Sequence, residues 1–219
     1  GKRTVVYSGT TKAVTLHKLE GAAEVGDLAT FSFKAVPSEE PQPVYFSLQS
    51  LDNVGNRSET RFAQAVLPAA DVVAKESFDV ESAFQATGDF QQVDYEGRGG
   101  IFSSQPGSEG SVATSVLTSP EIDLSERENA FLKFDFKTDL ERGEWARVWA
   151  SSDGEKWTRE AILRKSTDGW TEQGVDISEY DGEKVRLRFV VNATEGGNQG
   201  TLMVDNFRVL SEPVSSLLK

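Results

Sequence analysis

The sequence has no cysteine, one methionine and one histidine, His17. Without cysteine the chain can form no disulfide bond and has no thiolate chemistry. A serine nucleophile needs an imidazole beside it, and His17 lies among predicted strand residues with no catalytic motif nearby. The chain also lacks a G-x-S-x-G elbow, a P-loop and an H-E-x-x-H pair. We therefore expect no catalytic constellation here, and interpret His17 as a surface residue of a strand.

Long apolar runs and helix signals are also missing. No apolar stretch approaches the roughly 18 residues of a membrane-spanning helix, so we expect no membrane span. Apolar residues instead recur at every second position, between turns rich in glycine, asparagine, aspartate and serine, which is typical of β-strands. The predicted fold class is therefore all-β, with two antiparallel β-sandwiches.

Positive charge is scarce, because 23 lysine and arginine residues stand against 35 acidic ones, which gives a net charge of -12. Through Pro68 there are seven basic and seven acidic side chains, so the whole excess lies in the rest of the chain. A field of this sign repels a phosphate backbone, and we expect no nucleic-acid partner. Calcium ions or cationic surfaces are compatible with it, and so is a plain contribution to solubility.

A change of composition at "LPAADVVAKES", Leu67 to Ser77, divides the chain. We predict a first domain at residues 1–68, a linker at 69–75, a second domain at 76–212 and a tail at 213–219. In the first domain the alternation predicts strands at 4–7, 13–19, 30–36, 44–51 and 60–66. Two long strands of the second domain alternate strictly, with apolar residues on one side at 130, 132, 134 and 136 and at 185, 187, 189 and 191. One buried and one wet face is typical of an antiparallel sandwich.

The end of the first domain consists of a strand with Tyr45, the turn "LDNVGNRSE" and a closing strand. This order resembles the last two strands of a fibronectin type III or immunoglobulin-like domain. Such a domain has seven strands over about 100 residues, whereas the alternation predicts fewer strands over a shorter segment. The resemblance therefore implies a sandwich that is truncated, or that is completed by a neighbour.

The second domain carries a longer series of motifs: "SFD", "LTSPEIDLS", "FLKFDF", "VWASSDGEKW", "GWTEQGVDISEYDGEKVRLRF" and "MVDNFRVL". In this order they resemble the MAM-like jelly-roll domains of secreted bacterial peptidases and adhesins, over roughly Glu76 to Ser211. The resemblance implies an extracellular, non-catalytic accessory region of a secreted, subtilisin-type peptidase, which binds a protein substrate or a surface, adds stability and is covalently linked to an upstream catalytic domain. The alternative is a carbohydrate-binding or adhesive module of a cell-surface protein, with a glycan ligand. The absence of cysteine also fits an exported protein.

Jelly rolls of this kind often carry a structural calcium ion near the joined ends of their first and last strands. The resemblance places Glu76, Asp79, Asp205 and Asn206 there, and their oxygens are ligands that calcium accepts. Asp205 interrupts an apolar strand, where an unpaired carboxylate is costly. The alternative is a hydrogen-bonded turn, or an ion pair with Arg208.

A candidate ligand-binding face follows from "GEWARVWASS", in which Ala146, Val148 and Ala150 suit the core. The other face of this strand then carries Trp145, Arg147 and Trp149, which could stack on sugar rings or peptide side chains. We expect four more cations to share this face if their strands lie alongside: Lys133, Lys137, Arg186 and Arg188. The alternative is that the tryptophans pack under a loop or against the first domain.

The segment that follows this strand, Ser152-Asp153-Gly154, has the composition of a hairpin turn rather than of an active site. Trp157 and Trp170 each follow a glycine turn by a few residues. We predict that both tryptophans cover an end of the core.

Overall fold

The computed structural model describes residues 3–5, 14–16, 33–50, 56, 58–104, 114–141, 143–163, 165–192 and 200–213. The chain forms two compact units, one at residues 1–70 and one at residues 71–219. In the first unit the described strands are β1 (Arg3–Val5), β2 (Val14–Leu16), β3 (Phe33–Ala35), β4 (Gln42–Ser50) and β5 (Arg61–Leu67). They form the antiparallel sheets β1-β4-β5 and β2-β3. Each strand overlaps a predicted one, and the likeness to a fibronectin type III domain stays a prediction.

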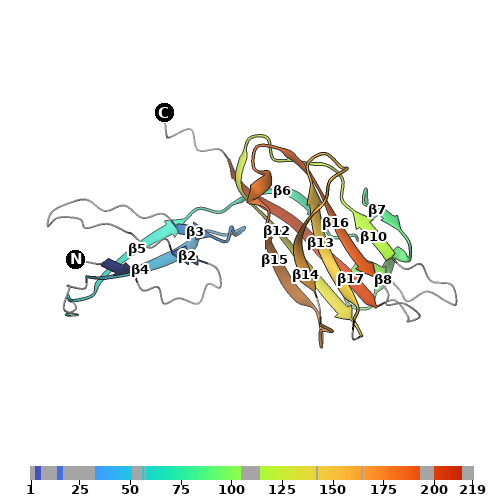
Figure 1. Ribbon diagram of the computed structural model, residues 1–219, viewed down its shortest axis with the longest axis horizontal. Coiled ribbons are helices and arrows are strands. Elements are labelled where there is room, and N and C mark those ends of the chain that lie inside the picture. The colour runs from blue at the N-terminus through green and yellow to red at the C-terminus, as the bar shows by residue number, and fades with distance from the viewer. Residues whose placement is uncertain are drawn as a thin grey trace. The chain divides into compact units, whose positions relative to one another are not determined.

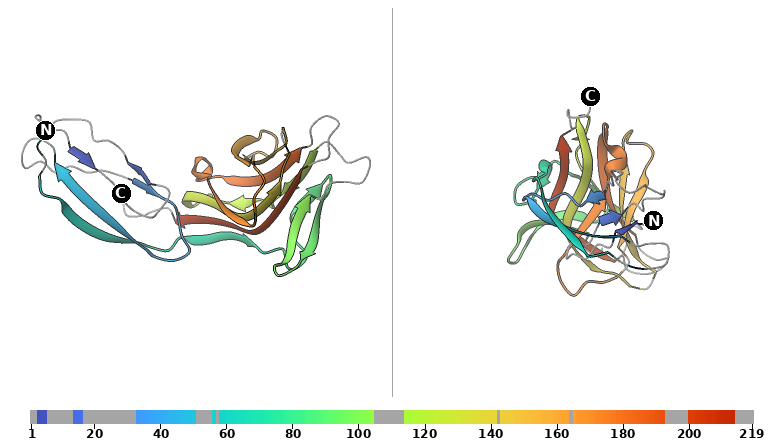
Figure 2. Two further views of the ribbon diagram at one scale, coloured as in Figure 1. Left: turned by 90° about the horizontal axis from the view of Figure 1, so that it is seen from below. Right: turned by 90° about the vertical axis from the view of Figure 1, so that its left-hand side faces the viewer.

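The second unit is an antiparallel β-sandwich, which confirms the predicted fold class (Figure 1). One sheet, named here the β13–β16 sheet, has the order β14-β13-β16-β10-β7, with β11 paired to β16. The other, the β12–β17 sheet, has the order β15-β12-β17-β9-β8, with β6 paired to β17. Figure 2 shows the same strands from two further sides. Their bounds are β6 Asp71–Glu76, β7 Gln85–Thr87, β8 Phe90–Tyr95, β9 Gly99–Ser104, β10 Thr114–Thr118, β11 Ile122–Asp123, β12 Arg127–Asp139, β13 Trp145–Ser151, β14 Thr158–Leu163, β15 Thr171–Asp176, β16 Lys184–Asn192 and β17 Thr201–Pro213.

The predicted linker at 69–75 is largely a strand. Residues 71–76 form β6, which pairs with β17 so that Ala74 lies opposite Val209. Composition marked the change between the units but did not show that Val73 and Ala74 pack against the core of the second one. The second unit therefore begins at Asp71, before the predicted Glu76.

The core of the second unit lies between its two sheets. The predicted inward residues of β12 and β16 are all buried, as their alternation requires. Phe134 from β12 meets Phe189 from β16 edge-to-face, with 4.9 Å between ring centres. Phe189 in turn lies 6.3 Å from Phe207 of β17. Each buried phenylalanine contributes about 1.5–3 kcal/mol by burial, and the edge-to-face contacts fix how the sheets interlock.

Helical structure in the described part of the chain is limited to one short 3-10 turn, η1 (Ser178–Tyr180). None of its helices is long and apolar enough to cross a membrane.

Candidate functional site

The outer face of the β13–β16 sheet presents one row of large polar and aromatic side chains across four strands. Trp149 of β13 lies opposite Arg188 of β16. Arg188 lies opposite Thr118 of β10, and Thr118 lies opposite Gln85 of β7. Because directly opposite residues lie side by side on one face, the row is continuous.

The predicted ligand residues Trp145, Arg147 and Trp149 lie on this outer face, since their neighbours in β13 are buried. Arg147 occupies part of the aromatic surface: its guanidinium carbon lies 3.5 Å from the Trp145 ring centre and 5.9 Å from that of Trp149. Arg186 and Arg188 lie on the adjacent strand β16, as predicted. A ligand-binding role for the three β13 residues stays a prediction.

Lys133 and Lys137 do not share this face, and that expectation was wrong. Both belong to β12, which lies in the other sheet between β15 and β17. Lys137 there donates a hydrogen bond to the Tyr95 hydroxyl at 3.1 Å, and Lys133 lies 3.9 Å from a carboxylate oxygen of Glu172. Local alternation gives the side of a strand but not the sheet to which the strand belongs.

The turn after β13 is held by its own side chains. The Ser151 hydroxyl donates to Asp153 at 3.0 Å and accepts the backbone N–H of Gly154 at 2.9 Å. Asp153 also accepts the backbone N–H groups of Lys156 and Glu155, and these hydrogen bonds lower the pKa of its carboxyl. Gly154 has a φ of 76°, which favours glycine. Residues 152–154 therefore lie in a hairpin turn between β13 and β14, as predicted, and Ser151 and Asp153 hold this turn together.

This turn places Trp157 over Arg188. The Trp157 indole N–H donates to the Gly154 carbonyl at 3.1 Å, and the ring centre lies 3.7 Å from the guanidinium carbon of Arg188. Trp157 is half-buried and lies outside the cluster of buried core residues, so the prediction that it covers the core was wrong. Alternation along β16 predicted that Arg188 lies on this face, but nothing in the local sequence predicted its contact with Trp157.

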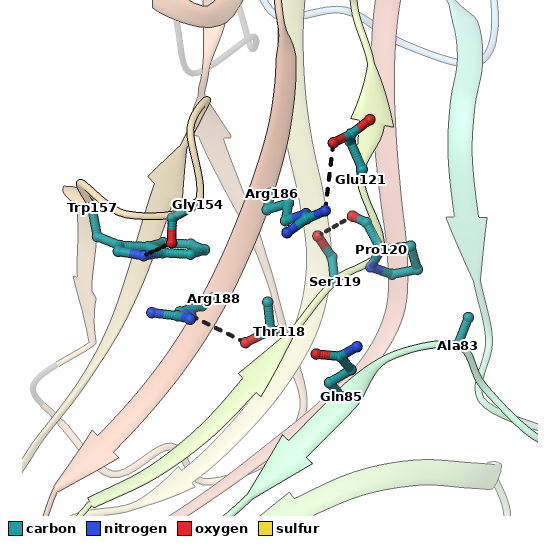
Figure 3. Close-up of a pocket in the computed structure, with 10 residues that line it drawn as sticks. All are labelled: Ala83, Gln85, Thr118, Ser119, Pro120, Glu121, Gly154, Trp157, Arg186 and Arg188. Carbon is teal, nitrogen blue, oxygen red and sulfur yellow. Dashed lines mark hydrogen bonds and ion pairs between the residues drawn. The ribbon is translucent and has the colours of Figure 1, made fainter.

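A cavity of about 160 Å³ opens beside this stacked pair (Figure 3). Its lining is mostly polar and comes from β7, β10, β16 and the turn after β13, together with the segments next to them. Figure 3 shows Trp157, Arg186, Arg188 and Gln85 around the same space. The volume is below the roughly 300–1,000 Å³ of pockets that enclose drug-sized ligands, so this pocket suits part of a larger, exposed ligand. The lining residues are Ala83, Gln85, Thr118, Ser119, Pro120, Glu121, Gly154, Trp157, Arg186 and Arg188.

Two arginines set the charge of this pocket. Burial lowers the pKa of the Arg188 guanidinium, which stays charged because arginine is not deprotonated in proteins. Arg186 lies 3.5 Å from a carboxylate oxygen of Glu121, and the other oxygen of Glu121 pairs with Lys184 at 3.0 Å. This hydrogen bond raises the pKa of Lys184. The pocket is therefore locally basic on an acidic protein.

The four predicted calcium ligands make other contacts. Glu76 accepts hydrogen bonds from the Phe78 N–H at 3.0 Å and the Ser82 hydroxyl at 3.2 Å. Asp79 accepts the N–H of Gly100 at 3.0 Å.

Asp205 and Asn206 belong to a different group of contacts. Asp205 forms an ion pair with Arg98 at 2.7 Å, rather than with the predicted Arg208. Asn206 donates its amide N–H to Asp135 at 2.9 Å. In this arrangement a guanidinium lies beside the carboxylate that a calcium ion would need, and the described residues contain no cluster of three or more His, Cys, Asp or Glu side chains able to hold a metal. Calcium binding by these four residues stays a prediction of the resemblance, which melting with and without EGTA tests.

No protein-family model matches the chain, and no curated protein matches it. Solved structures with a similar fold include a family 61 carbohydrate-binding module in complex with β-1,4-galactotriose, at 12% identity and a TM-score of 0.43, with 60% of this chain and 90% of that chain covered. They also include a family 29 carbohydrate-binding module, at 19% identity and a TM-score of 0.41, with 65% of this chain and 87% of that chain covered. At such identities and TM-scores these likenesses assign no function to this chain.

Proposed function

We propose that the unit at residues 71–213 is a non-catalytic carbohydrate-binding module, and that it binds through the outer face of the β13–β16 sheet. One observation carries the proposal: Trp157, Arg188 and Gln85, from distant parts of the sequence, surround one polar cavity on that face. A sugar ring combines apolar C–H faces with a rim of hydroxyl groups. Aromatic surface beside fixed donors and acceptors matches both features.

The chemistry of the lining suits hydroxyl groups. The guanidinium groups of Arg186 and Arg188 donate hydrogen bonds, the carboxylate of Glu121 accepts them, and the Gln85 amide does both. Gln85 is exposed and makes no side-chain hydrogen bond within the described ranges, so its amide is available to a ligand.

Trp145 and Trp149 would extend this face for a longer chain of sugars. They are half-buried rather than fully buried, and Trp149 lies directly opposite Arg188. Sugars added beyond the cavity would then run across the strands, over the row that contains Trp149.

The test is a glycan array followed by titration calorimetry, with the full chain and two tryptophan variants. We expect Trp157→Ala to weaken glycan binding about tenfold or more, because it removes the ring beside the cavity. Trp170→Ala is the matched control, since Trp170 packs on Tyr95 of the β12–β17 sheet and its loss leaves the cavity intact. An array without hits, or equal loss in both variants, would contradict the proposal.

Two predictions concern a larger parent protein and go beyond carbohydrate binding: a role as an accessory region of a secreted peptidase, and an extracellular location. An adhesive module is the same binding function set on a cell surface. All of these predict no turnover by the purified chain, and hydrolysis of a protein or glycan by it would contradict them.

A further inference from the structure

Arg188 is a cation that has no ion-pair partner among the residues that the structure describes. Within the described ranges, its side chain makes one hydrogen bond, from Nε to the Thr118 hydroxyl at 3.2 Å, and no ion pair. Guanidinium carries five N–H donors, so the four on its two terminal nitrogens remain for a ligand. A partly buried cation without a carboxylate partner is costly unless something pairs with it.

The guanidinium is also held in place before any ligand arrives. Trp157 covers one face of it at 3.7 Å, and the bond to Thr118 fixes its edge. A planar fork fixed in this way presents parallel donors, which match the two oxygens of a carboxylate. Little side-chain freedom is left to lose on binding.

A second guanidinium lines the same cavity. Arg186 approaches Glu121 only to 3.5 Å, while Lys184 holds the same carboxylate at 3.0 Å. Glu121 therefore divides its charge between two cations, and the charge of Arg186 is only partly balanced. The cavity thus holds more positive charge than negative, although the protein carries -12 in total.

We infer that the cavity takes the carboxylate of an acidic sugar, so that the module selects saccharides containing uronic acid. This rests on the proposed function. The carboxylate accepts hydrogen bonds from the terminal nitrogens of Arg188, and neighbouring hydroxyls reach Gln85 and Glu121. An acidic peptide suits the cavity less well, because an aspartate or glutamate side chain carries no hydroxyl group beside its carboxylate for the acceptor Glu121 to bind.

The experiment compares trigalacturonic acid with its methyl ester, which has the same sugars without the charge. Calorimetry uses the full chain, Arg188→Met and, as a control for lost charge, Arg61→Met on the exposed strand β5 of the first unit. We expect the acid to bind about tenfold or more tighter than the ester, as charge-assisted hydrogen bonds imply. Arg188→Met should remove this preference, and Arg61→Met should keep it. A single cooperative melting transition in each variant would show that both variants fold.

Two results would overturn the inference while leaving the proposed function intact: an ester that binds as tightly as the acid, or a preference that survives in Arg188→Met. The same comparison is made with glucuronate and mannuronate oligosaccharides and their methyl esters. Binding of neutral glycans alone would again refute only the selection of uronic acids. A complete absence of glycan binding would refute the proposed function itself. A glutamate-rich peptide that binds tighter than every sugar, through Arg188, would replace the saccharide as ligand.

Discussion

The guanidinium carbon of Arg188 lies 3.7 Å from the centre of the Trp157 ring, although β16 supplies the cation and the turn after β13 supplies the ring. A cation over an indole face is attracted to the electrons of the ring, by about 0.5–2 kcal/mol depending on how far water is excluded. The contact joins a surface turn to a central strand. It therefore contributes to stability as well as to the shape of the cavity.

A double-mutant cycle measures this contact. We expect Trp157→Ala and Arg188→Met to lose about 1 kcal/mol less free energy of unfolding together than the sum of their single effects, because either change alone already removes the stacking. Urea unfolding of the four proteins gives the coupling. Additive effects would show that the two side chains are neighbours without interacting.

Gly154→Ala tests whether the turn positions Trp157. A φ of 76° strains an alanine by about 1–2 kcal/mol, while the added methyl group meets only Arg186, at an ordinary 3.5 Å. Gly97 is the matched control, with a φ of 79°, nothing within 4 Å of an added Cβ, and a place in the turn between β8 and β9, which belong to the other sheet. We expect similar losses of stability in both variants, measured by urea unfolding, but weaker glycan binding only in Gly154→Ala. Equal glycan binding by the two variants would show that the turn does not position Trp157 for the ligand.

The faces of individual strands could be predicted because alternation is local. Leu132 and Leu187 point inward as expected, since a strand with one apolar side has only one way to bury it. Sheet membership could not be predicted in this way. Lys133 and Arg188 both occupy outward positions of alternating strands in the sequence, yet they lie on different sheets. Pairing between distant strands is decided by the packing of the whole core.

The candidate site was predicted only in part for the same reason. Trp149 was found from its own strand, and Arg188 from alternation in β16. Trp157 was interpreted from its position after a glycine turn, which cannot show that the turn folds back over a neighbouring strand. The cavity itself, with Gln85 from β7, depends on a strand that the sequence did not predict.

Arg98→Met tests what holds Asp205 in an apolar strand. Arg98 bridges Asp205 and Asp135, and the Asp205 side chain is only 4% exposed. Removing one partner leaves a buried carboxylate without its cation, and we expect a loss of about 3 kcal/mol. Arg127→Met, which breaks the more exposed pair with Asp71, should cost less than about 1 kcal/mol. Similar costs for the two variants in urea unfolding would contradict this account.

Glu160 gives the protein a pH dependence near neutrality. Burial, followed by a hydrogen bond with Glu179, raises the pKa of its carboxyl from 4.5 to about 7. The folded state therefore holds this proton at a pH where the unfolded chain has released it. The stability that comes from this raised pKa is fully present below about pH 4.5 and is lost as the pH rises through 7.

Glu160→Gln replaces the protonated form permanently, because an amide carries no charge and can still hydrogen-bond to Glu179. We expect this variant and the original chain to have similar free energies of unfolding at pH 5, and the variant to be the more stable at pH 8. Glu155→Gln, in the exposed turn after β13, is the control and should leave the pH profile unchanged. Urea unfolding at intervals from pH 4 to 9 makes the comparison. Parallel profiles for Glu160→Gln and the original chain would mean that Glu160 ionises at its ordinary pKa, and that its neighbours do not hold its proton.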